Sequence, residues 1–184
     1  MNSENKYGLT TVSHDADAKV DFRLAAARRR LAESCGKEDA IEALREIAGN
    51  FLGSEEICLF LLNVRTKEIE IVWSFGIDPA NCDLLGCLSD VGVRRIAEGE
   101  CHVELASDGS VAGTKAFVPI RVANDTVAVV AILRLLPQKL GFDRTDMDLL
   151  ALLSEEAGGA IFGPTLKTPT RETMTDRPER QHER

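Results

Sequence analysis

The sequence predicts one α+β domain in which an antiparallel sheet is framed by helices near both ends of the chain. Apolar residues recur at helical spacing up to Gly53 and again after Asp143, whereas the segment between them carries short apolar runs typical of strands. Asn124 and Asp125, between two of these runs, tolerate the positive φ angle of a tight hairpin turn. With 184 residues, the chain is long enough for one full-sized core.

Two helices are expected before the first strand. Residues 19–36 form a basic amphipathic helix, because an apolar stripe runs along one side while Arg28, Arg29 and Arg30 lie off it. Residues 38–52 form a second helix, and Gly53 ends it.

The middle of the chain reads as a series of strands. Residues 57–64 are almost continuously apolar and suit a central strand, whereas residues 69–75 alternate as a half-buried strand does. Further elements follow in order: an irregular segment 77–88, a short helix 90–98 capped by Ser89, and strands at 101–105, 115–122 and 126–136.

A last helix begins after Asp143 and runs to about Phe162. Its apolar arc is wider than one sheet face requires, which predicts a second packing partner. We expect this partner to be a second copy of the chain, forming a homodimer through the first and last helices. The interface residues expected are Leu24, Leu31, Leu149, Leu153 and Ile161.

Both ends of the chain have a different composition from the domain. Residues 1–18 are polar with few apolar anchors, and residues 164–184 carry three prolines among threonines and charged residues. Neither composition can bury a core, so we expect a disordered leader and a disordered tail around a domain at residues 37–163.

Charge and residue types exclude several classes of function. A net charge of -8 and a pI near 5.0 oppose nucleic-acid binding. No apolar run is long enough to span a bilayer and no signal peptide is recognisable, so we expect a cytoplasmic protein that does not enter the membrane. His102 is the only histidine outside the expected tails, and no catalytic triad or phosphate loop is present.

The order of elements, with several short motifs, resembles a GAF domain. The motifs are AIEAL and ICLFLL in the entry helix and first strand, WSFG closing the second strand, GVRRIAEG in the short helix, and AFVPI, ND, VAVVAIL, Phe142 and Asp146 at the end. Ala128 departs from the glycine of many members. The resemblance implies a five- or six-stranded antiparallel sheet with both terminal helices on one face and a loop-covered pocket on the other.

Candidate site residues follow from this expected pocket. Apolar walls would come from Phe60, Trp73, Phe75 and Phe117, although each residue also suits plain core packing. Cys82, Cys87 and Cys101 would lie nearby. Their loose spacing does not predict a metal site, and we expect neither metal nor other cofactor.

The resemblance implies a regulatory role in signal transduction. We expect the chain to bind an unidentified small ligand or sense redox state, and to pass this state through its terminal helices to a downstream protein. One alternative is a ligand-free dimerisation scaffold. A second is a cysteine-dependent free methionine sulfoxide reductase, since Cys87 and Cys101 resemble two cysteines of that GAF subgroup. The subgroup carries a further cysteine that this sequence lacks between Ser110 and Thr114, so no enzyme is predicted.

Overall fold

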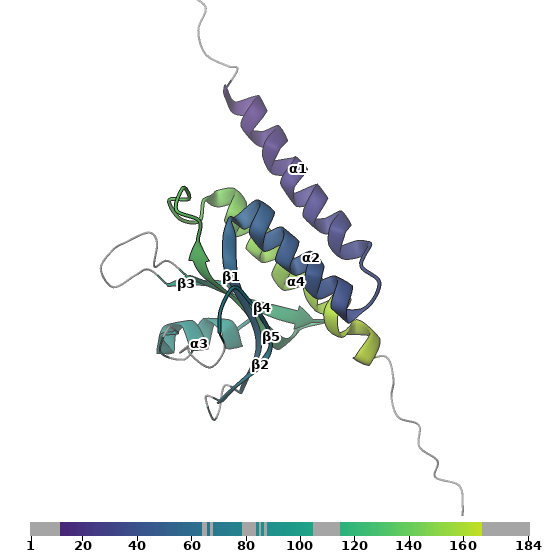
Figure 1. The fold of residues 1–184 in the computed structure, drawn as a ribbon, viewed down its shortest axis with the longest axis vertical. Coiled ribbons are helices and arrows are strands. Elements are labelled where there is room, and N and C mark those ends of the chain that lie inside the picture. Colours follow the sequence, from purple (N-terminus) through teal and green to yellow (C-terminus); the bar gives the residue numbers. More distant parts are fainter. Residues whose placement is uncertain are drawn as a thin grey trace, which may run out of the picture.

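The computed structural model describes residues 12–63, 66, 68–78, 84, 86, 88–104 and 115–166, with side chains placed from Phe22 to Gly163 within these ranges. Helices α1, α2 and α4 lie on one face of a sheet, and helix α3 lies on the other (Figure 1). This is the α+β arrangement that the sequence predicts.

The sheet has five strands in the order β2-β1-β5-β4-β3, and all neighbouring pairs are antiparallel. The strands are β1 Ser54–Asn63, β2 Glu68–Phe75, β3 His102–Glu104, β4 Lys115–Val122 and β5 Asp125–Leu135. One detail of the β4–β5 turn differs from the prediction, because the positive φ angle of 57° belongs to Ala123 rather than to Asn124 or Asp125.

The helices are α1 Val12–Ala32, α2 Lys37–Ile47, α3 Asp90–Ala97 and α4 Arg144–Leu166. Helix α1 begins well before the residue expected from the sequence, and its first turns extend beyond the rest of the fold (Figure 1). The predicted cap of α3 is confirmed, since the Ser89 side chain accepts a hydrogen bond from the Gly92 N–H.

Helix α2 does not end as an ordinary α-helix. It continues into a π-helical turn, η1 Ala48–Leu52, which Gly53 closes in the left-handed conformation with φ 67°. The Gly53 N–H bonds to the Ala48 carbonyl, so the last turn is wider than an α-helical turn. This turn sets where the chain enters β1.

Side chains that alternate along the strands form two separate apolar clusters. One cluster joins the sheet to α1, α2 and α4, and includes Leu44, Leu59 and Val130. The other joins the sheet to α3, and includes Phe60, Phe117 and Ile96. The sheet is thus covered on both faces, which explains the nearly continuous apolar run in β1.

The structure places most of the residues expected at a dimer interface in the core of the single chain. Leu31, Leu149, Leu153 and Ile161 are almost completely buried within the single chain, and Leu24 packs against the same cluster. The second partner of the broad apolar arc of α4 is therefore the chain's own α1 and α2. Four of these residues therefore lie in the core of the protomer, whereas Leu24 is only partly buried.

Candidate ligand cavity

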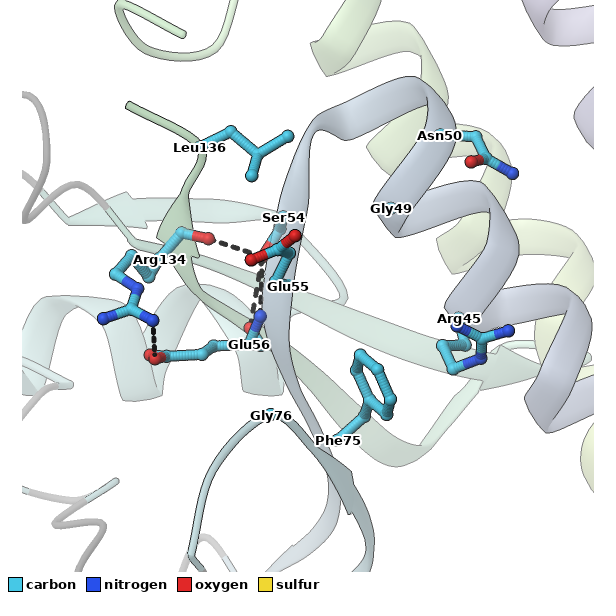
Figure 2. A pocket seen from close by; sticks show the side chains of 10 residues that line it. All are labelled: Arg45, Gly49, Asn50, Ser54, Glu55, Glu56, Phe75, Gly76, Arg134 and Leu136. Carbon is cyan, nitrogen blue, oxygen red and sulfur yellow. Dashed lines mark hydrogen bonds and ion pairs between the residues drawn. The ribbon is translucent and has the colours of Figure 1, made fainter. Parts of the chain in front are cut away.

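A half-open cavity of about 420 Å³ lies where the start of β1 meets η1 and the ends of β2 and β5 (Figure 2). We call it the strand-end cavity. Its volume is within the range of small-molecule sites. The lining residues are Arg45, Gly49, Asn50, Ser54, Glu55, Glu56, Phe75, Gly76, Arg134 and Leu136.

The floor of the strand-end cavity is an irregular start of β1. The pairing of β1 with β5 shifts register on both sides of Glu56, and the buried Ser54 hydroxyl donates a hydrogen bond of 2.7 Å to the Arg134 carbonyl. Gly76 passes so close that a Cβ atom there would lie 1.9 Å from the Glu55 carbonyl oxygen. Its φ angle of 74° also favours glycine.

The walls carry two arginines, each already paired with a carboxylate of the chain. The Arg45 guanidinium donates to Glu42 at 2.9 Å, and these hydrogen bonds lower the pKa of the Glu42 carboxyl. Arg134 pairs with Glu56 at 2.7 Å. By contrast, the exposed Glu55 carboxylate has no ion-pair partner among the residues that the structure describes.

An aromatic surface completes the lining. Phe75 is 41% exposed, and its ring lies parallel to that of Trp73 with centroids 6.4 Å apart. The guanidinium of Arg45 sits over the Phe75 ring, 5.1 Å from its centroid. Figure 2 shows the Phe75 ring and the Arg45 side chain at one end of the cavity and Arg134 at the other.

A chain of polar contacts connects the cavity wall to both terminal helices. Arg23 of α1 donates to the carbonyl of Phe51 in η1, next to the lining residue Asn50. The same guanidinium donates to Asp146 of α4 at 2.9 Å. Asp146 is fully buried and also binds the Lys139 ammonium at 2.8 Å.

The structure separates the aromatic residues that the sequence grouped into one pocket. Phe75 lines the strand-end cavity and Trp73 lies beside it, on the face that carries the terminal helices. Phe60 and Phe117 are fully buried on the opposite face, inside the cluster under α3. The four residues therefore do not line one site, because successive strand residues point to opposite faces.

The cysteines are also separated. Cys101 packs on the terminal-helix face, whereas Cys58 is buried under α3. Burial, with a contribution from the charge of Glu155, raises the pKa of the Cys101 thiol to about 11, so it is protonated at neutral pH. Cys82 and Cys87 lie outside the described residues.

A second cavity, of about 260 Å³, lies on the α3 face of the sheet. Its lining is mainly apolar, with Asp125 and Thr126 as polar groups; the apolar residues are Leu62, Ile96, Ala97, Val127, Ala128 and Val129. Elsewhere on this face, His102 on β3 is buried against Gly92 of α3, with its Nε2 atom 2.9 Å from Glu104. Burial alone would raise the pKa of Glu104, but hydrogen bonds from Ser89 and His102 lower it overall.

Within the described ranges, no group of three or more histidine, cysteine, aspartate or glutamate side chains is arranged to hold a metal ion. The helices in those ranges include none with the length and apolar character needed to cross a membrane.

Most residues of the strand-end cavity were missed by sequence reasoning. Arg45, Glu55 and Arg134 look like ordinary solvated charges in the sequence, and they converge only because η1 and the irregular start of β1 bring three strand ends together. The available signals were Gly53 and Gly76, which flank the entry and exit of the first hairpin.

The fold is that of GAF domains. The GAF domain of an Acinetobacter phosphoenolpyruvate-protein phosphotransferase matches with a TM-score of 0.60 and 16% identity, over 80% of this chain and 96% of that one. The GAF domain of a putative sensor histidine kinase from Pseudomonas syringae pv. tomato matches with a TM-score of 0.56 and 12% identity, over 83% and 92%.

One similar structure is an enzyme. Free methionine-R-sulfoxide reductase from Neisseria meningitidis, in complex with its substrate, has a TM-score of 0.53 and 18% identity, over 85% of this chain and 98% of that one. No protein-family model matches the sequence, and no curated protein matches it. At these identities the similarity establishes the fold and leaves the ligand open.

Proposed function

We propose that this protein is a regulatory sensor module that binds a small molecule in the strand-end cavity and signals through its terminal helices. The observation that carries the proposal is the Arg23 bridge, defined as the contacts of Arg23 with the Phe51 carbonyl and with Asp146. The first contact joins the cavity wall to α1, and the second joins α1 to α4.

The bridge gives ligand binding a physical route to the helices. Gly49 and Asn50 line the cavity from η1, and Phe51 follows them directly. A ligand that displaces η1 must therefore move the Phe51 carbonyl relative to Arg23. Because Arg23 also neutralises the buried Asp146, this movement changes the packing of α1 against α4.

The proposed output is a change at α1 that a downstream signalling protein recognises. Solved GAF domains of similar fold come from a phosphotransferase and a sensor kinase, which supports a regulatory role in a larger signalling system. A cytoplasmic location and a homodimer remain part of the proposal. Such a dimer would use outward residues such as Phe22, which is 68% exposed, instead of the buried interior of α4.

The coupling is testable before the ligand is known. A Cβ atom on Gly49 would have no neighbour closer than 3.8 Å, so Gly49→Leu fills part of the cavity without a backbone clash. We expect faster amide hydrogen exchange in α1 of this variant. Gly159→Leu is the matched control, because it also places leucine on a helical glycine with open space around it, away from the cavity.

A second substitution shows whether the bridge transmits the effect. In an Arg23→Gln background, Gly49→Leu should add no further exchange in α1. Unchanged α1 exchange in Gly49→Leu with Arg23 intact would contradict the proposed route. A metabolite screen read by Trp73 emission, from the only tryptophan, then identifies the ligand.

The scaffold alternative is favoured by one observation. Phe60 and Phe117 are fully buried on the α3 face of the sheet, where a GAF-like pocket is expected, and the cavity that remains on that face is smaller than the strand-end cavity. A pure scaffold would show no ligand in the metabolite screen and no response of α1 to Gly49→Leu.

The reductase alternative is supported by the Neisseria meningitidis structure but opposed by Cys101. A thiol with a pKa of about 11 is a poor nucleophile at neutral pH. Incubation with free methionine sulfoxide and a dithiol reductant tests this alternative, and turnover would make the protein an enzyme.

A further inference from the structure

We propose that the strand-end cavity selects a small organic cation, such as an alkylammonium compound. This inference rests on the proposed function, since it names the ligand class of the same cavity. It depends on which charges in the cavity are already neutralised, on the exposed aromatic ring, and on the charge of the whole chain.

The charges that are free to meet a ligand are negative. Arg45 is held by Glu42 and Arg134 by Glu56, so both cations of the lining are neutralised within the chain. Glu55 is exposed and has no such partner among the described side chains. A cation therefore finds an available carboxylate.

An anion would face the opposite situation. An anion that contacted Arg45 or Arg134 would have to share the guanidinium with the carboxylate of Glu42 or Glu56, and it would approach the unpaired charge of Glu55. Repulsion by Glu55 and by the paired carboxylate would oppose its binding. The lining thus discriminates against a carboxylate or phosphate ligand.

Phe75 supplies a second contact suited to a cation. The negative face of an aromatic ring attracts ammonium and guanidinium groups, and the position of Arg45 above Phe75 shows this attraction within the molecule. Phe75 lines the cavity and is 41% exposed, so a ligand can contact the part of its side chain that Arg45 and Trp73 leave uncovered. The hydrocarbon body of the ligand would contact this ring and Leu136.

The charge of the whole chain favours the same class of ligand. With a net charge of -8, the protein attracts cations to its surface and repels anions. The volume of about 420 Å³ accommodates a molecule of several heavy atoms in place of a bare inorganic ion.

The test uses three probes of equal chain length and different charge: cadaverine, pentane-1,5-diol and glutarate. Choline is added as a quaternary cation. Because its nitrogen carries no N–H donor, comparison with cadaverine shows how much of the binding depends on hydrogen bonds from nitrogen and how much on charge and contact with the aromatic ring. Binding to the full chain is measured by calorimetry and by Trp73 emission. We expect cadaverine or choline to bind and glutarate and the diol not to bind at the same millimolar concentration.

Glu55→Gln should weaken cation binding about tenfold or more, because it removes the charge while retaining the size of the side chain. Glu70→Gln is the matched control, since Glu70 is an exposed glutamate of β2 outside the cavity lining. Both side chains are exposed, so neither variant threatens folding.

Three results would overturn the cation assignment: tighter binding of glutarate than of cadaverine, equal affinity in Glu55→Gln, or no binding of either cation. None of them decides the proposed sensor function, which fails separately if Gly49→Leu leaves α1 unchanged. A cavity that couples to α1 but prefers glutarate would retain the sensor and reject the cation.

Discussion

Asp146 is the residue whose substitution tests the architecture most directly. Its carboxylate is fully buried and accepts charged hydrogen bonds from Arg23 at 2.9 Å and Lys139 at 2.8 Å. It also accepts the Asp143 N–H, while Asp143 accepts the Asp146 N–H, both at 2.8 Å. One side chain therefore joins α1, the segment after β5 and the first turn of α4.

Asp146→Asn removes the negative charge and keeps an oxygen for the Asp143 N–H. Breaking a buried ion pair costs about 3–5 kcal/mol, because the remaining charge is left without a partner. Here Arg23 is 26% exposed and Lys139 18% exposed, so both recover some water and the lower end of that range applies. We expect a loss of about 3 kcal/mol in the free energy of unfolding, equivalent to a fall of roughly 6–12 °C in Tm.

Urea denaturation followed by circular dichroism and by Trp73 emission measures this loss. Asp148→Asn is the control, since Asp148 is exposed on the same helix and its charge change should alter stability by less than about 0.5 kcal/mol. Amide exchange should also accelerate in α1. If Asp146→Asn were as stable as Asp148→Asn, the buried pair would not hold α1 and α4 together, and the route from cavity to helices would lose its support.

Three further predictions concern packing and thiol chemistry. A Cβ atom on Gly158 would lie 1.9 Å from the Arg121 carbonyl oxygen, so Gly158→Ala should lower the free energy of unfolding by about 3 kcal/mol or more, as measured by thermal denaturation. Gly159→Ala, which places its methyl group in open space, should be neutral or stabilising by up to about 1 kcal/mol. Equal stability of the two variants would refute the close approach of α4 to β4. The pKa of Cys101 rises from 9.0 to about 11 on folding, so the folded state keeps a proton that the unfolded chain loses, and stability should fall as pH rises from 9 to 11. Alkylation at neutral pH, mapped by mass spectrometry, should modify the exposed Cys35 well before Cys101, and rapid modification of Cys101 would contradict its burial.

Local signals in the sequence predict the elements of the fold. Hydrophobic periodicity, Ser89 as a helix cap and the turn between β4 and β5 are local signals, because each depends on neighbours only a few residues away. For this reason the strands and α3 lie close to their predicted positions, and the GAF fold was recognised from the ordered motifs. The width of the apolar arc of α4 also predicted a second packing partner for that helix.

The packing partners of each element are visible only in the folded chain. An apolar arc looks the same whether its partner is the same chain or a second copy, and only the fold shows that α1 and α2 cover α4. Trp73 and Phe60 both read as pocket aromatics in the sequence, yet the pleat of β1 and β2 places them on opposite faces. Glu55, Arg134 and Arg45 form a site because a π-helical turn and an irregular strand start bring distant segments together, and such convergence leaves no periodic trace in the sequence.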